Sequence, residues 1–272
     1  LQVNTITDEL RLATNFQGKV VSISLKDRGS ILPGGHSANA AYWHDGLTGN
    51  WITSTHYMEK LPNWVDKFNA LKVSDVFFGQ DWNTLYPINS YINSDDDNVS
   101  YEGRFKDENS SSFPHLTKQY IGKNYEMIKS LPYGNTLTID FAKLAIENEN
   151  LGKDAITDFL TISCSSTDYI GHQFGPNSIE IEDTYLRLDK DLEGLFNYLD
   201  QKVGKGNYLF FISSDHGVAN APEYLTKHNI PTERYSTRPI VKQLDSLLKE
   251  NFKLEKSVLS IINDQIIFNH DV

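Results

Sequence analysis

Two strongly apolar segments joined by one long amphipathic helix constrain the fold of this chain most. Residues 158–163 (Asp-Phe-Leu-Thr-Ile-Ser) and 208–213 (Tyr-Leu-Phe-Phe-Ile-Ser) are typical of strands buried on both faces, as in a parallel sheet covered by helices. Between them, residues 178–202 carry apolar side chains at alternating spacings of four and three, which predicts a helix with one core-facing stripe. Strand, helix and strand together predict a right-handed βαβ crossover. We therefore expect an α/β fold with a mostly parallel sheet covered by helices.

The remaining elements follow from periodicity and turn signals. We expect a helix near residues 7–12, a strand over 19–25, loops at 26–29 and 33–35, a β-hairpin within 41–57, a helix over 61–68, a long surface loop over 93–112, helices over 138–148 and 238–252, and a hairpin over 258–268 around Asn263-Asp264. The whole of 1–272 is interpreted as a single, truncated α/β domain, with 29–130 as an insertion or loop-rich region inside it.

Composition excludes several classes of function. The net charge of −11 over 272 residues argues against a nucleic-acid-binding face, because neutralising phosphates requires clustered Lys and Arg. Cys164 is the only cysteine in the sequence, so no intrachain disulfide can form. No run approaches the roughly 20 apolar residues of a membrane span. Residues 1–12 show no signal peptide, and because the chain opens at Leu1 rather than methionine, we expect a processed or cut product.

A carboxylate and an imidazole follow each of the two apolar segments. Asp168 and His172 are four residues apart, which would place both on one face of a helical turn, and Asp215 and His216 are adjacent. Since the carboxyl ends of parallel strands meet at one edge of a sheet, we expect the two pairs to lie close together. Carboxylate and imidazole groups suit Zn²⁺, although a catalytic zinc uses three protein ligands, so two are insufficient alone. Taken singly, each pair could also be a solvated surface pair.

Lys26 and Arg28 lie just past the predicted strand 19–25. A lysine point charge and a planar arginine fork are common partners of phosphoryl oxygens, although a solvated loop with Asp27 as counter-ion is the plainer interpretation. Cys164 has no basic neighbour in the sequence and is expected to be a packed small side chain. The remaining histidines show no interpretable pairing and are expected to be surface or loop residues: His36, His44, His56, His115, His228 and His270.

Three motifs carry a family resemblance: 22–36 (SISLKDRGSILPGGH), 165–176 (SSTDYIGHQFGP) and 214–217 (SDHG). With them the chain resembles the alkaline phosphatase superfamily, in particular the PafA-like bacterial alkaline phosphatases, which are related to nucleotide pyrophosphatases/phosphodiesterases. The resemblance implies hydrolysis of small phosphate monoesters at two zinc ions through a covalent phosphoenzyme. It implies that Asp168 and His172 ligate one zinc and Asp215 and His216 the other, with Lys26 and Arg28 on the nonbridging phosphate oxygens. It also implies a periplasmic or secreted protein.

Parts of the family pattern have no counterpart in this sequence. These are the upstream Thr or Ser nucleophile, an upstream metal-binding Asp, an Asn that holds the phosphate, and a downstream zinc-binding His. We therefore expect a middle portion of a longer enzyme that is inactive alone. Two alternatives stay open: a phosphodiesterase or nucleotide pyrophosphatase of the same superfamily, against which Lys26 and Arg28 argue, and a non-catalytic binding or structural module. A sulfatase is disfavoured because Cys164 lacks a Cys-x-Pro-x-Arg context. The sequence does not identify the physiological ester, the metal or the oligomeric state.

Overall fold

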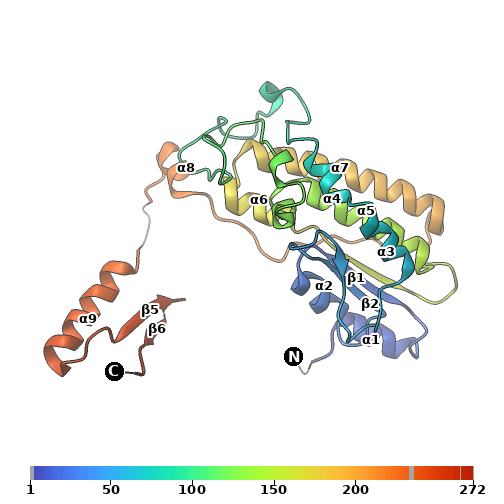
Figure 1. Ribbon diagram of the computed structural model, residues 1–272, viewed down its shortest axis with the longest axis horizontal. Helices are drawn as coiled ribbons and strands as arrows, with labels where there is room; N and C mark the ends of the chain where they lie inside the picture. Colours follow the sequence, from blue (N-terminus) through green and yellow to red (C-terminus); the bar gives the residue numbers. More distant parts are fainter. Residues whose placement is uncertain (1–2, 233–235, 264, 272) are drawn as a thin grey trace. The chain divides into compact units, whose positions relative to one another are not determined.

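A computed structural model describes residues 3–232, 236–263 and 265–271 of the chain. The contacts divide the chain into two compact units, Leu1–Ala221 and Pro222–Val272 (Figure 1). The candidate site residues all belong to the first unit. The interpretation of 1–272 as a single domain with an insertion over 29–130 stays a prediction.

The first unit is built on a four-stranded sheet with the order β3-β2-β1-β4. The central strand β1 (Val20–Ser24) pairs in parallel with β2 (Ala40–His44) on one side and with β4 (Phe159–Ser163) on the other. The short β3 (Trp51–Ile52) runs antiparallel to β2, as the predicted hairpin requires. Every residue of β1 is buried, which explains its unbroken apolar and small composition. The α/β prediction with a mostly parallel sheet is confirmed.

Helices cover both faces of this sheet (Figure 1). On one face α2 (Asp27–Gly34) packs on β1 and β2, and α1 (Ile6–Ala13) packs on α2. On the other face α5 (Tyr133–Asn148) packs on β1 and β4, with the long α7 (Ile179–Leu199) against α5. The shorter elements are α3 (Asn63–Ala70), α4 (Val73–Phe78), α6 (Ser166–Phe174), the 3₁₀ turns Ile88–Ser90, Lys118–Tyr120 and Tyr125–Ser130, and a π turn over Asp200–Gly204.

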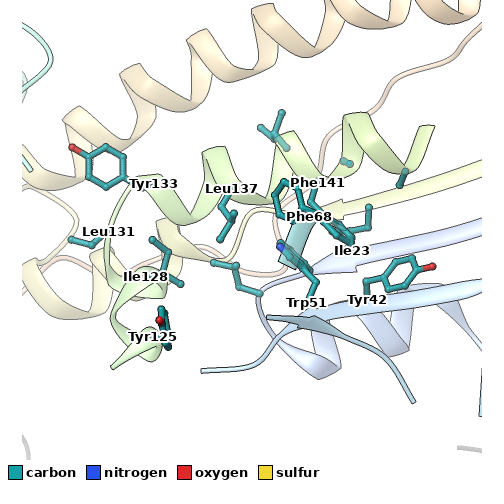
Figure 2. Packing of buried hydrophobic residues seen from close by; sticks show 14 of the residues in the cluster. Ile23, Tyr42, Trp51, Phe68, Tyr125, Ile128, Leu131, Tyr133, Leu137 and Phe141 are labelled. Carbon is teal, nitrogen blue, oxygen red and sulfur yellow. The ribbon is translucent and has the colours of Figure 1, made fainter. Parts of the chain in front are cut away.

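Aromatic side chains fill the space between the sheet and α5 (Figure 2). Phe141 is fully buried and stacks on Trp51, with ring centroids 4.1 Å apart and planes inclined by 10°. Tyr42 and Phe68 approach the same ring edge-on at 5.5 and 5.3 Å. Such pairs contribute beyond their buried area. This packing fixes β2 and β3 against α5.

Side-chain hydrogen bonds cap the N-termini of α1 and α7. Ser178 caps α7 by accepting a hydrogen bond from the Ile181 amide at 3.2 Å, and Gly204, with φ of +106°, ends the π turn that continues α7. The predicted loops at 26–29 and 33–35 are wrong, because α2 runs through both and includes Pro33. The hydroxyl of Thr7 donates to the carbonyl oxygens of Pro33 and Gly34, so a contact from α1 holds the last turn despite its poor helix formers.

The predicted strand over 208–213 is also wrong. The structure assigns no strand there, and Leu209 and Ile212 are 90% and 70% exposed. β4 consequently stays at the edge of the sheet, and the predicted βαβ crossover is not completed within the described part of the chain. An apolar segment forms a strand only where it can pair with a neighbouring strand and bury its side chains.

The second unit contains α8 (Pro222–Lys227), α9 (Arg238–Phe252) and a two-stranded antiparallel sheet of β5 (Val258–Ile262) and β6 (Gln265–Phe268). The predicted helix over 238–252 and hairpin over 258–268 are confirmed, with Asn263 at φ of +49° in the turn; Asp264 lies outside the described residues. Among the described helices of the chain, none has the length and apolarity needed to cross a membrane.

Candidate functional site

The carboxyl ends of β1 and β4 bring Lys26 and Asp168 together. The two strands are parallel neighbours with Ser24 opposite Ser163, so the residues that follow them emerge at one edge. Lys26 precedes α2, and its backbone N–H donates to the Ser24 hydroxyl at 3.0 Å. Asp168 lies in the first turn of α6. Lys26 Nζ lies 3.0 Å from Asp168 Oδ2, an ion pair between elements 142 residues apart in the chain.

The other oxygen of Asp168 faces two imidazoles. His172, one turn further along α6, places its Nε2 3.3 Å from Asp168 Oδ1. His216, in the segment after α7, places its Nε2 3.6 Å from the same oxygen and 3.6 Å from Asp215 Oδ2. The structure therefore brings the two acid–imidazole pairs to one place. His172, Asp215 and His216 are largely exposed there, at 78%, 86% and 57% of their side-chain surface.

The electrostatics of the cluster keep Asp168 ionised. Burial acts to raise the pKa of this carboxyl, but the Lys26 ammonium, with His172 and His216, outweighs burial and holds the pKa below its usual value. The pKa of His216 is raised, first because its ring hydrogen-bonds the Gly217 carbonyl and then because Asp215 and Asp168 lie nearby. Because Asp168 stays charged, its carboxylate is suited to bind a metal cation in place of its present contacts with the ammonium and the imidazoles.

Arg28 lies on the first turn of α2 with its side chain exposed. It does not touch Asp168 through any described contact, but it lines a cavity of about 300 Å³ together with Lys26. Tyr169 also lines this cavity. Lys26 Nζ lies over the Tyr169 ring, 4.7 Å from its centroid, in a cation–π contact. Lys26 is thus held from two sides and presents its charge to an open space large enough for a small ester.

The residue types at this edge fit part of a zinc site. Carboxylate oxygens and imidazole nitrogens are ordinary zinc ligands. Here the Nε2 atoms of His172 and His216 both lie close to one oxygen of Asp168, Oδ1. Within the described residues, however, no three histidine, cysteine or carboxylate side chains are arranged as a finished metal site. The cluster thus supplies ligands of the right chemistry without forming a complete ligand set.

Several features of the site were not predicted. Tyr169 stood beside Asp168 in the sequence, but its contact with Lys26 depends on how α6 is oriented. The far wall of the cavity comes from β2, from the turn after it and from the 3₁₀ turn at Tyr125–Ser130, through Trp43, Asp45, Glu126 and Lys129 among others. No local pattern connects those segments with 26–28, so only the folded chain shows the cavity.

The prediction for His44 is wrong, and the cysteine prediction is confirmed. His44 is buried in β2 beside the Ser74 hydroxyl at 3.1 Å, and burial lowers its pKa to about 4. His115 is fully buried between Glu108 and Glu180, at 2.9 and 3.2 Å. His44 was expected in a loop or at the surface, and His115 lies in a loop as expected but is buried, because a single histidine in a sequence carries no sign of its burial. Cys164 packs against the core, and burial raises the pKa of its thiol to about 12.

Known proteins resemble this chain in both sequence and fold. Residues 4–269 match the family described as type I phosphodiesterase / nucleotide pyrophosphatase. The chain is 57% identical over its whole length to alkaline phosphatase PhoV of Synechococcus elongatus, covering 49% of that protein. It is 48% identical to alkaline phosphatase PafA of Elizabethkingia meningoseptica, over 98% of this chain and 49% of the relative. The crystal structure of PafA superposes with a TM-score of 0.91 at 48% identity, over 99% of this chain and 51% of the PafA chain.

The chain belongs to the type I phosphodiesterase / nucleotide pyrophosphatase family, within the alkaline phosphatase/phosphodiesterase superfamily of hydrolases. Inside that superfamily its sequence and fold resemble those of the PafA-like alkaline phosphatases. The chain spans about half the length of the curated relatives it matches.

Proposed function

We propose that the intact protein hydrolyses small phosphate monoesters at a zinc centre built at the carboxyl edge of β1 and β4. The observation that carries the proposal is the position of Asp168: one of its oxygens lies 3.0 Å from Lys26 Nζ, and the other faces His172 and His216 at 3.3 and 3.6 Å. Oxygen and nitrogen ligands for a metal thus lie beside a cation for the phosphoryl group. The alkaline phosphatase relatives support the same class of reaction.

Lys26 and Arg28 are proposed to bind the nonbridging oxygens of the phosphoryl group. Both line the same cavity, one as a compact ammonium and the other as a planar fork, and such charges stabilise a transferring phosphoryl group. A solved mutant of PafA carries substitutions of a lysine and an arginine two positions apart, which is the spacing of Lys26 and Arg28. Tyr169 keeps Lys26 directed at the cavity.

Asp168 and His172 are proposed to hold one zinc ion, and Asp215 and His216 a second. When bound, zinc would polarise the phosphoryl oxygens and stabilise charge on the attacking and leaving oxygens. The chain's own contribution is to hold Asp168 in its ionised form and to present two imidazole nitrogens next to it. Metal content of the intact protein, compared with Asp168→Ala and Asp215→Ala, tests the assignment: each substitution is expected to lower bound zinc by about one ion per chain.

The 272-residue chain alone is proposed to show negligible turnover. The nucleophile that the family resemblance implies has no counterpart in this sequence, and the Cys164 thiol is buried with a raised pKa, so it stays protonated at neutral pH. Robust, zinc-dependent phosphatase activity of the purified chain would overturn this part of the proposal. The resemblance also leads us to propose a periplasmic or secreted location for the intact protein.

The decisive experiment compares a phosphate monoester with a phosphate diester in the intact protein. We expect p-nitrophenyl phosphate to be preferred over bis(p-nitrophenyl) phosphate, and Lys26→Met and Arg28→Met each to lower kcat/KM for the monoester by about 10²-fold, the usual loss when one preorganised charge contact is removed. The diester offers fewer charged nonbridging oxygens, so its kcat/KM should fall less. Lys118→Met is the matched control, because Lys118 also forms an ion pair, with Asp81 at 2.8 Å.

A phosphodiesterase or nucleotide pyrophosphatase is the second candidate, because the matching family is described by those activities. The same assay separates the two. A preference for the diester that survives Lys26→Met and Arg28→Met would favour the second candidate and contradict the monoesterase proposal.

A further inference from the structure

The long loop over 93–112 is fastened to the end of α6 and to the start of α7 by hydrogen bonds. The Ser94 hydroxyl donates to the Ser178 carbonyl at 3.0 Å, and the Gly103 amide donates to the Gln173 carbonyl at 2.7 Å. Behind these contacts lie Asp97 and Glu102 of the loop and Glu180 of α7, whose side chain is fully buried. Sequence patterns predicted only a surface loop here, so the buried carboxylates need an explanation.

Each of these acids uses one oxygen and leaves the other without a donor. Asp97 Oδ2 accepts from the Phe113 amide, Glu102 Oε2 from the Ser111 hydroxyl, and Glu180 Oε1 lies 3.2 Å from His115 Nε2. The second oxygens are buried and have no hydrogen-bond partner among the described residues: Asp97 Oδ1, Glu102 Oε1 and Glu180 Oε2. An unsatisfied buried acceptor costs about 1–3 kcal/mol, more when charged. Three in one place point to a ligand that supplies positive charge.

A fourth oxygen comes from the connection between α6 and α7. The side-chain oxygen of Asn177, Oδ1, is also buried without a partner in the described part of the chain, three residues before Glu180. The Asn177 oxygen is uncharged, so its lack of a hydrogen-bond partner is a separate observation from the charges of the three acids. Amide and carboxylate oxygens together are the mixture that Ca²⁺ takes in proteins, with six to eight oxygen ligands in flexible geometry.

The three acids are close enough to repel one another. Burial, and then the charge of Glu180, raises the pKa of Asp97, and burial raises the pKa of Glu102 to about 7, with Glu180 and Asp97 adding to the effect. His115 is the neighbouring cation: burial would lower its pKa, but Glu108 and Glu180 outweigh burial and raise it to about 9. One imidazolium therefore lies near the carboxylates of Glu108, Glu180 and Asp97, with Glu102 next to the last two, and a divalent cation would offset most of the remaining charge.

We propose that Asp97, Glu102, Asn177 and Glu180 form a structural Ca²⁺ site that fastens the 93–112 loop to α7, separate from the cluster around Asp168. The four oxygens named above are its protein ligands, and water or backbone carbonyls complete the shell. Within the described residues no three acid or imidazole side chains form a finished metal site, so the ligand side chains would adjust when the ion binds. The site holds a structural cation and takes no part in the chemistry at Lys26.

Calcium binding to the full 272-residue chain tests the site without reference to activity. After chelation and dialysis, titration calorimetry with CaCl₂ is expected to show one site with a Kd of about 10⁻³ M or tighter, and Ca²⁺ is expected to raise the midpoint of thermal unfolding. Glu102→Gln keeps an acceptor for the Ser111 hydroxyl and replaces the unpartnered oxygen by an amide group. It should weaken Ca²⁺ binding at least tenfold and abolish the thermal shift.

Two controls make the outcome specific. Asp107→Asn removes an exposed carboxylate of the same loop and should leave Ca²⁺ binding unchanged. Asp168→Ala disables the candidate zinc cluster and should also leave it unchanged, so that failure here and failure of the phosphatase proposal are distinguishable. Absence of Ca²⁺ binding by the wild-type chain at millimolar concentration, or binding that is lost in Asp168→Ala and kept in Glu102→Gln, overturns the proposal. The first result would mean that a proton on Glu102 satisfies the cluster instead.

Discussion

Replacing Lys26 by methionine separates a functional role of this residue from a structural one. Met keeps much of the aliphatic stem and removes the ammonium, so the change deletes the 3.0 Å ion pair with Asp168 and the contact with the Tyr169 ring. The two charged side chains are 29% and 28% exposed, so the pair is partly screened and contributes about 0.2–1 kcal/mol. The cation–π contact contributes about 0.5–1 kcal/mol. The variant should therefore lose less than about 2 kcal/mol of its free energy of unfolding.

Function should respond far more strongly than stability. Urea unfolding of the chain gives the first quantity, and inhibition of the intact protein by inorganic phosphate gives the second. We expect Lys26→Met to weaken phosphate inhibition at least tenfold, which corresponds to about 1.4 kcal/mol. Lys118→Met, which breaks the 2.8 Å pair with Asp81, should cost similar stability and leave phosphate inhibition unchanged. A loss above about 3 kcal/mol for Lys26→Met, or equal phosphate inhibition in both variants, would refute the reasoning.

Four further predictions concern the core, a buried ion pair, the thiol and the exposed apolar segment. Phe141→Ala should lower the free energy of unfolding by about 3–5 kcal/mol in urea, whereas Phe16→Ala, at a residue that is 52% exposed, should lower it by less than about 1 kcal/mol. His115 has a folded pKa raised to about 9 from 6.5, so its stabilisation is complete below pH 6.5 and is lost as the pH rises through 9; His115→Gln should therefore cost more stability at pH 6 than at pH 10, and equal cost at both would contradict the ion pair. Cys164, with its pKa raised to about 12, should react with iodoacetamide at pH 8 much more slowly in the native chain than in urea, as mass spectrometry can show. Limited chymotrypsin digestion of the native chain should cut first within 208–212, and resistance there with cleavage inside α5 would be contrary evidence.

The central part of the fold and of the candidate site could be predicted because local patterns and strand geometry agree. Residues 158–163 and 19–25 are buried enough to be recognised as strands, and parallel neighbours deliver their following residues to one edge. That rule led us to expect the two acid–imidazole pairs together, and helical spacing placed His172 on the same face as Asp168. The ion pair of Lys26 with Asp168 was not predicted. The prediction needed no knowledge of the loops between 35 and 130.

Side chains whose partners come from distant segments could not be predicted. His115 is neutralised by Glu108 of its own loop and by Glu180 of α7, 65 residues away, and the sequence gives no sign that these segments meet. The same holds for Asp97 and Glu102, whose composition suggested a solvated loop. A run of acidic residues is typical of an exposed loop, but such residues can be buried when another part of the fold supplies an opposite charge or a bound cation.

The segment 208–213 shows how composition can indicate a preference that the chain does not realise. Its side chains are those of a buried strand, yet Phe211 and Leu209 are 67% and 90% exposed. Phe210 lies against the ring of Phe196 of α7 at 4.8 Å, and Phe211 lies 6.0 Å from the ring of Phe159 of β4. The segment therefore passes close to α7 and to β4, the edge strand of the sheet, without pairing with β4.

A strand buried on both faces needs cover from other elements, and this chain spans about half the length of its relatives. His216 nevertheless reaches Asp168, because the path from α7 past β4 already leads to the carboxyl edge. The position of the second acid–imidazole pair thus depends on the direction of the chain after α7 and does not require a strand over 208–213.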